Sequence, residues 1–290
     1  MEDFGGKVAV VTGTANPLGI GYATCRALAA EGCTLVLADL NGEGAEARAE
    51  ELRAGGTKAI AVRTDMSDEG SVQALADAAY TQFGAVHILL LNHVAPTGGP
   101  GHGLLNPGST PWVLHANVNL LGCVYGIKAF VPRMVDGGEH CHVLATTSGA
   151  GATGTMYGNG PYAVTKAAIT SLMECLYGQL RDAGADVVAS LVFPGVTSTH
   201  GPEEVGQRTV QMLQSYGMPA SLMTADEVAA FTIDAIRRDT FWAKPDPASE
   251  IHREIFDWQK EIYRLRAEAI VKRTPPDPYL WGPPSNVLGQ

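Results

Sequence analysis

A serine, a tyrosine and a lysine lie close together in residues 148–166, SGAGATGTMYGNGPYAVTK, where they could act on one proton. Tyr162 and Lys166 are four residues apart, so a helix over about 161–183 would place both side chains on one face. A phenol titrates near ~10, and a neighbouring ammonium favours its ionised form. The spacing therefore predicts a tyrosine acid/base, although a surface pair is the commoner meaning of this pattern alone.

A glycine-rich turn near the start of the chain has the composition of a phosphate-binding loop. The apolar run KVAVV predicts a buried strand, the turn TGTANPLGIG follows, and YATCRALAAEG predicts a helix. Gly13, Gly19 and Gly21 would let the backbone approach a pyrophosphate, whose charge the free amides and dipole of the helix stabilise. The pattern predicts a dinucleotide site, with an ordinary loop as the alternative.

Asp39 ends the next predicted strand, TLVLADL, and can contribute to such a site. An acid about 20 residues beyond the glycine turn can accept hydrogen bonds from the adenosine ribose and repels a 2′-phosphate. This favours NAD over NADP, unless Asp39 only caps the following segment.

Asn119 and the Pro194-Gly195 pair complete a set of motifs. In this order, the motifs resemble the short-chain dehydrogenase/reductase family over about residues 5–245. The first two glycines are two residues further apart than is usual in that family, which leaves the detailed shape of the loop open. The resemblance implies a Rossmann-type doubly wound parallel sheet with helices on both faces.

The resemblance also implies the catalytic roles. Tyr162 is expected to exchange a proton with the substrate, and Lys166 to lower the pKa of Tyr162 and bind the cofactor ribose. Asn119 is expected to distort its helix so that a backbone carbonyl holds a water reaching Lys166.

A serine of the family is expected to hydrogen-bond the substrate oxygen. Its interval to Tyr162 is 14 residues if it is Ser148, one more than expected, so Thr147 and Gly149 are alternatives. Gly149 has no hydroxyl, and SGAG fits the family's Ser-x-x-Gly, which favours Ser148.

The resemblance places the cofactor and substrate contacts as follows. The expected cofactor contacts are Gly13, Asn16, Leu18, Gly19, Ile20, Asp39, Leu40, Asp65, Met66, Asn92, Tyr162, Lys166, Pro194, Gly195, Val196, Thr197 and Thr199. The expected substrate contacts are His93, Ser148, Met156, Tyr157, Tyr162, Met212 and Tyr216. His93 stands where the family commonly has a second Asn, and a structural role is the alternative for it. Residues 200–223 predict an apolar lid over the substrate, an amphipathic helix, or both.

The elements that position these residues alternate between strands and helices over one domain, 1–290. The core is expected over about 5–245, and a C-terminal amphipathic helix and a Pro-rich tail over 246–290. Residues 96–111 are rich in Gly and Pro and predict a loop bordering the site. Small residues at 122, 126, 163, 167 and 168 suggest close packing against partner helices, in keeping with a homodimer or homotetramer.

Composition limits the partners of the protein. A formal charge of −10 argues against nucleic acid and anionic membranes. Five scattered cysteines, with no metal-ligand spacing, predict a cytoplasmic protein with reduced thiols and no metal site. The start of the chain shows no signal-peptide pattern, and no apolar run approaches the length of a membrane span.

The motifs together predict an NAD-dependent oxidoreductase that interconverts a bulky, apolar secondary alcohol and its ketone. Within the family, GPYAVTKAAITSLME, FVPRM and the helix after FWAKP look most like bacterial dehydrogenases of lignin-derived aryl ethers. A steroid or cyclic-alcohol dehydrogenase is an alternative. So is a non-catalytic NAD(H)-binding regulator, although such proteins usually lose the Tyr or the Lys.

Overall fold

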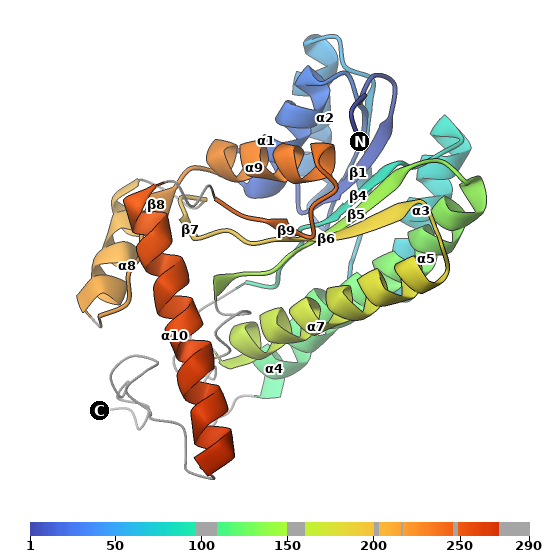
Figure 1. The fold of residues 1–290 in the computed structure, drawn as a ribbon. Helices are drawn as coiled ribbons and strands as arrows, with labels where there is room; N and C mark the ends of the chain where they lie inside the picture. Colours follow the sequence, from blue (N-terminus) through green and yellow to red (C-terminus); the bar gives the residue numbers. More distant parts are fainter. Residues whose placement is uncertain (97–108, 150–159, 200–202, 216, 246–248, 273–290) are drawn as a thin grey trace.

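A seven-stranded parallel sheet forms the centre of the molecule (Figure 1). The computed structural model describes residues 1–96, 109–149, 160–199, 203–215, 217–245 and 249–272. The strands run in the order β3-β2-β1-β4-β5-β6-β9. Their bounds are β1 Val8–Thr12, β2 Thr34–Asp39, β3 Ala59–Arg63, β4 Ile88–Leu91, β5 Cys141–Thr146, β6 Val187–Val192 and β9 Trp242–Ala243. This order reverses direction between β1 and β4, which defines a doubly wound fold with a crevice at the carboxyl ends of the strands.

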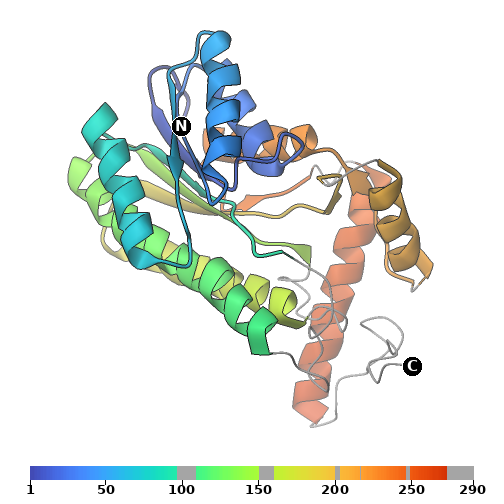
Figure 2. The same cartoon turned by 180° about the vertical axis from the view of Figure 1, so that it is seen from behind.

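Helices cover both faces of the sheet, as the two opposite views show (Figures 1 and 2). One face carries α1 Ile20–Ala30, α2 Gly42–Ala54 and α9 Ala225–Arg237. The other carries α3 Glu69–Phe83, α5 Gly122–Gly137 and α7 Gly160–Asp182. The expected Rossmann-type, single-domain architecture is therefore confirmed.

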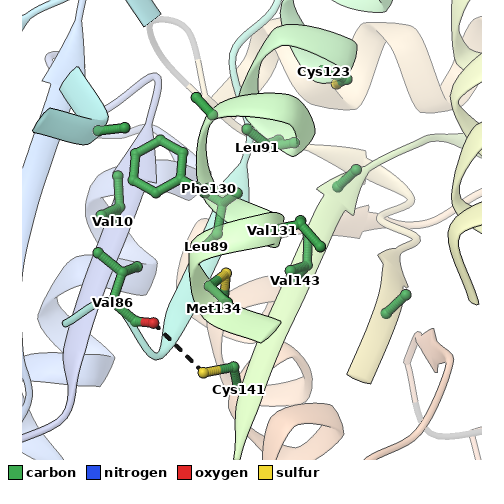
Figure 3. Packing of buried hydrophobic residues seen from close by; sticks show 14 of the residues in the cluster. Val10, Val86, Leu89, Leu91, Cys123, Phe130, Val131, Met134, Cys141 and Val143 are labelled. Atoms are coloured by element: carbon green, nitrogen blue, oxygen red, sulfur yellow. Dashed lines mark hydrogen bonds between the residues drawn. The ribbon is translucent and has the colours of Figure 1, made fainter. Parts of the chain in front are cut away.

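The core is divided into two layers by the alternation of side chains along each strand. On β2, Val36 and Ala38 pack with the cluster under α3, α5 and α7, whereas Leu35 and Leu37 pack with the cluster under α1 and α9. Figure 3 shows part of the first cluster, where Phe130 and Met134 of α5 lie over the sheet. Strands covered on both faces account for the continuous apolar runs in the sequence.

Short hydrogen-bonded caps fix where several helices begin. The Asn41 side chain accepts from the Gly44 amide at the start of α2, and the Asp68 side chain accepts from Gly70 and Ser71 at the start of α3. Thr224 and Glu227 form a reciprocal capping box at the start of α9.

The helix before α5 begins earlier than the sequence predicted. α4 Ser109–His115 starts inside the predicted loop 96–111, and the part of that loop over 97–108 lies outside the described residues. Pro111 is compatible with this helix because it lies in the first turn, where a backbone N–H has no helical partner to lose. α4 continues through the π-helix η1 Ala116–Leu121 into α5.

The continuous helix Pro111–Gly137 corrects the expectation about apolar runs. By length and composition alone it could cross a membrane, and 44% of its apolar window is buried inside the fold. Its packing against α3 and the sheet provides a structural reason for its apolar composition.

The C-terminal part of the chain adds two helices and a small second sheet. α8 Glu203–Ser215 occupies most of the predicted lid, so the amphipathic-helix interpretation holds there, with Val210 as its buried residue. β7 Val196–Thr197 pairs with β8 Leu222–Met223. α10 Glu250–Lys272 extends past the start of α7 (Figure 1), and the predicted tail 273–290 lies outside the described residues.

Candidate active site

Tyr162 and Lys166 lie on one face of the first turns of α7, as their spacing predicted. The Lys166 ammonium is 5.7 Å from the centroid of the Tyr162 ring, and the Lys166 side chain is nearly completely buried. Its Nζ donates a hydrogen bond to the Thr146 carbonyl, at 2.6 Å. Burial lowers the pKa of Lys166 to about 8, against a smaller opposite effect of Cys123.

The pKa of Tyr162 is shifted in the direction opposite to the one expected from sequence. Burial of the phenol raises this pKa, and the hydrogen bond with the Ser148 side chain lowers it by less. The Lys166 ammonium does not contribute to this shift, and its Nζ donates to the Thr146 carbonyl instead of to the phenol. Tyr162 is therefore protonated at neutral pH and suited to donate a proton.

Asn119 lies at the point where the helix before α7 is widened. The Gly122 amide donates to the Asn117 carbonyl, five residues back, and η1 is a π-helix. Asn119 is fully buried; its Oδ1 accepts from the Ala95 amide at 2.7 Å, and its Nδ2 lies 3.0 Å from Thr165 Oγ1. The distortion expected at this residue is therefore present.

Three threonines and a histidine complete the site, although sequence reasoning missed them. Thr165 lies between Tyr162 and Lys166 and is bonded to Asn119, and the Thr146 carbonyl receives Lys166. The His115 and Tyr162 rings lie nearly perpendicular to each other, with centroids 6.5 Å apart. Thr12, at the end of β1, accepts from the Asn92 amide. His115 and Asn119 are hydrogen-bonded to each other and lie four residues apart in the sequence. This spacing places two side chains on the same face of a helix, so it could have indicated that His115 lies at the site with Asn119.

Asn92 connects the central strands near their carboxyl ends. Its Oδ1 accepts from Thr146 Oγ1 at 2.9 Å, joining the ends of β4 and β5. His93, predicted as a substrate contact, is buried, with its Nδ1 2.9 Å from Thr12 Oγ1. This placement favours the structural alternative for His93, and contact with substrate stays a prediction.

The glycine turn lies at the crevice and leaves no room for side chains at two positions. Gly13 has φ +74°, a conformation that L side chains rarely adopt. A Cβ at Gly21 would lie 2.3 Å from the Gly13 carbonyl oxygen, so the start of α1 packs directly on the turn. Gly19 is the N-cap of α1 with no side-chain cap, so amides of the first turn, from Ile20 on, are available to an anion. These features fit the pyrophosphate of a dinucleotide.

Asp39 faces the glycine turn from the end of β2. Its Oδ2 accepts from the Ala15 amide at 2.9 Å, and its Oδ1 accepts from the Asn41 amide at 3.0 Å. Leu18 and Leu40 are both exposed, as suits side chains that cover an adenosine. The carboxylate therefore lies at the end of β2 beside the glycine turn, and its contact with an adenosine ribose stays a prediction.

The remaining predicted cofactor contacts line the same edge of the sheet. Asp65 accepts two hydrogen bonds from Ser67, which lower its pKa, and Met66 is buried. Pro194 and Gly195 follow β6, and Val196 and Thr197 form β7. Asn16 Nδ2 donates to the Thr199 carbonyl at 2.7 Å, which ties the glycine turn to this segment.

The predicted substrate contacts are only partly described. Met156, Tyr157 and Tyr216 lie outside the described residues. Met212 is 45% exposed on α8, and Ser148 is hydrogen-bonded to Tyr162. α10 reaches the same end of the sheet, since a Cβ on Gly149 would lie 3.8 Å from Gln259 Nε2. Among the described residues, no group of three His, Cys, Asp or Glu side chains is placed to hold a metal ion.

The chain belongs to the short chain dehydrogenase family, whose model matches residues 7–209. It is 30% identical to 1-deoxy-11-beta-hydroxypentalenate dehydrogenase of Streptomyces exfoliatus over 96% of this chain and 95% of that protein. It is 34% identical to cis-4-hydroxycyclohexanecarboxylate dehydrogenase of Sinomonas cyclohexanicum over 68% of this chain and 76% of that protein. It is also 32% identical to glycine betaine reductase ATRR of Emericella nidulans over 80% of this chain, but spans 18% of that protein's length.

Solved structures of the family include complexes with either dinucleotide. A short chain dehydrogenase/reductase from Burkholderia phymatum, in complex with NAD, has a TM-score of 0.78 and 34% identity over 98% of this chain and 100% of that one. One from Burkholderia cenocepacia J2315, in complex with NADP, has a TM-score of 0.70 and 25% identity over 83% of this chain and 96% of that one. The fold and the glycine turn are thus those of a family that binds NAD or NADP.

Proposed function

We propose that the protein is an NAD-dependent oxidoreductase that interconverts a bulky, apolar secondary alcohol and its ketone. The observation that carries this proposal is the grouping of Ser148, Tyr162 and Lys166 at the carboxyl end of the sheet, the end at which the glycine turn also follows β1. Retention of both Tyr162 and Lys166 argues against a non-catalytic regulator.

The chain's own residues perform the proton chemistry. The bound nicotinamide would accept or donate the hydride. Tyr162 donates its phenolic proton to the ketone oxygen, or removes the hydroxyl proton of the alcohol, while Ser148 hydrogen-bonds the same oxygen. The Lys166 ammonium stabilises the negative charge that develops on the phenol, and Asn119 holds α7 in register through Thr165.

Asp39 supports the preference for NAD. Its carboxylate lies beside the glycine turn, where it would accept from the ribose hydroxyls and repel a 2′-phosphate. Fluorescence titration of the protein with NADH and NADPH tests this preference. Equal affinity for both would overturn it.

The substrate class rests on apolar surroundings and on the relatives. Met212 is exposed on α8, and two relatives are named for alicyclic hydroxy acids. An apolar pocket contributes about 25 cal/mol per Å² of buried surface, so bulky alicyclic and aryl alcohols gain more from it than short aliphatic ones.

NADH formation with a panel of alcohols tests the substrate class. The panel contains cyclohexanol, 1-phenylethanol, 2-butanol and a small hydroxy acid. It also contains one alicyclic alcohol in two forms, with and without a carboxylate, so that recognition of the ring is separated from recognition of the charge. We expect the highest kcat/KM for the ring-containing alcohols without a carboxylate. A clear preference for 2-butanol or the small hydroxy acid would contradict the proposal.

We also propose a cytoplasmic location and a homodimer or homotetramer. All five cysteines are free, and Cys25, Cys33, Cys123 and Cys141 are buried, which suits a reducing compartment. Exposed apolar side chains on α4 and α7, such as Val113 and Val164, suit a surface covered by a second copy.

A further inference from the structure

His93 is a buried histidine beside the candidate active site that the proposed chemistry does not use. It lies two residues beyond the end of β4, after Asn92, and is 7% exposed. Its ring lies between the end of β1 and the widened turn η1, with Nδ1 near Thr12 and Nε2 near Cys123. The ring thus connects the sheet to the helix that carries Asn119.

The hydrogen bonds of Thr12 determine what His93 Nδ1 does. Thr12 Oγ1 accepts from the backbone amides of Asn92 and His93, at 2.9 and 3.2 Å. Its single proton is then left to donate, and its shorter contact is His93 Nδ1 at 2.9 Å, against 3.3 Å to the Leu90 carbonyl. Nδ1 is therefore the acceptor nitrogen of the ring.

The widened turn provides the partner for the other nitrogen. In an α-helix the Gly122 amide would bond the Val118 carbonyl, but here it bonds the Asn117 carbonyl. The Val118 carbonyl is thereby freed from Gly122, and His93 makes a hydrogen bond to it. Since a carbonyl only accepts, the imidazole must donate, and the neutral ring carries its proton on Nε2.

Gly122 makes room for this arrangement. A Cβ at this position would lie 2.8 Å from His93 Nε2 and 2.7 Å from the Met66 carbonyl oxygen. Cys123 Sγ lies 3.9 Å from the same nitrogen. The helix can approach the ring only because position 122 has no side chain.

The ring stays neutral over the working pH range. Within the described part of the chain, the titratable groups that face it are Lys166 and Cys123. Burial and the Lys166 charge lower the pKa of His93 to about 3, against the Val118 hydrogen bond, and burial raises the pKa of the Cys123 thiol to about 12. A neutral imidazole places no second positive charge beside Lys166.

We propose that His93 is a positioning residue, which bridges Thr12 to the Val118 carbonyl and so fixes the widened turn that places Asn119 against α7. Through Thr165 this turn sets the position of Tyr162 and Lys166 relative to the end of β1. The inference rests on the proposed catalytic role of these two residues. It predicts a loss of turnover, with little change in binding, when the bridge is removed.

Three variants test the bridge by kinetics. His93→Leu removes both hydrogen bonds and should lower kcat by about 10- to 100-fold, because catalytic groups that are slightly misplaced lose that much rate. KM and the Kd for NADH should stay within about threefold of wild type. His93→Gln keeps a donor and an acceptor and should recover most of the loss. His142→Leu is the matched control, because His142 is also buried but bonds Ser190 at the other end of the sheet, and it should change the thermal midpoint without lowering kcat. A kcat within twofold of wild type in His93→Leu, or no recovery in His93→Gln, would overturn the proposal.

Nitrogen-15 NMR of the histidine-labelled protein tests the tautomer without any substrate. We expect a neutral His93 ring protonated on Nε2 that does not titrate between pH 8 and about pH 5. A ring protonated on Nδ1, or one that titrates near pH 6.5, would contradict the bridge. This measurement does not depend on turnover, so it stands even if Tyr162 is shown not to be the acid/base, and the two proposals fail separately.

Discussion

At the scale of single residues, the charge of Lys166 and the protonation of Tyr162 decide the chemistry. The pKa of Tyr162 is raised by burial, and that of Lys166 is lowered to about 8. Both shifts come from removing the groups from water, and each favours the neutral form. Sequence spacing gave the pair correctly but could not give these directions, because burial is a property of the packed fold.

These shifts predict the pH dependence of ketone reduction. Reduction needs a protonated Tyr162 and a charged Lys166, so kcat/KM should be constant near neutral pH and fall above about pH 8, where Lys166 loses its proton. Alcohol oxidation needs the Tyr162 phenolate and should rise with pH through the neutral range. Initial rates in both directions from pH 6 to 10 are the measurement. A reduction rate that increases steadily up to pH 10 would contradict the assignment.

Asp39 provides a second prediction at this scale. Asp39→Ala should weaken NADH binding by roughly 10- to 100-fold, because that is the contribution of hydrogen bonds to a charged group. The ratio of the NADH affinity to the NADPH affinity should therefore decrease. Asp39→Asn keeps the size of the side chain and removes its charge, so NADPH binding should improve relative to the parent. Isothermal titration with both cofactors measures this. The interpretation is wrong if the Asn variant leaves the ratio of the two affinities unchanged.

At the scale of elements, the sequence predicted the strands and the helices that carry chemistry, and missed the details set by packing. The apolar run KVAVV and the spacing of Tyr162 and Lys166 are local signals, and β1 and α7 appear where they were predicted. The threonine contacts of Asn92, Asn119 and Lys166 join residues from different elements, so no local pattern reports them. Pro111 was read as a loop residue, although the first turn of a helix accepts it.

The close contact between α1 and the glycine turn gives a prediction about an element. Gly21→Ala would place a methyl group 2.3 Å from the Gly13 carbonyl oxygen, so the turn must shift. NADH affinity should then fall at least about tenfold, because the backbone of this turn has to approach the ligand closely. Gly178→Ala is the control, because a Cβ there meets nothing within 4 Å, and Ala should stabilise α7 by about 0.5–1 kcal/mol. Cofactor titration and thermal unfolding report both effects. Unchanged NADH affinity in Gly21→Ala would show that the turn does not hold the cofactor.

At the scale of the whole molecule, the small residues of α5 serve the fold rather than a partner. Cβ atoms at Gly122 and Gly126 would meet Met66 and Leu91 of the same chain, which corrects the interpretation that these glycines face a second copy. The surface proposed for oligomer formation is instead apolar and exposed, and includes Val113 of α4 and Val164 of α7.

This surface predicts the effect of a charge. Light scattering coupled to gel filtration should give the molar mass of a dimer or tetramer at micromolar concentration. Val164→Asp should lower this mass toward that of the monomer, because an unpaired charge is costly to bury. Val205→Asp on α8, also at an exposed valine, is the control and should leave the mass unchanged. A monomeric parent protein would contradict the oligomer proposal without affecting the active site.

The central claim, that Tyr162 is the acid/base, is tested most directly by Tyr162→Phe. The change removes one oxygen, so general acid–base catalysis is lost while the apolar ring stays, and kcat should fall by about 10²- to 10⁴-fold. NADH affinity should stay within about threefold of the parent, which would show that the site is intact. Retention of more than about a tenth of the parent turnover, with the best alcohol from the panel, would contradict the assignment of Tyr162 as the acid/base.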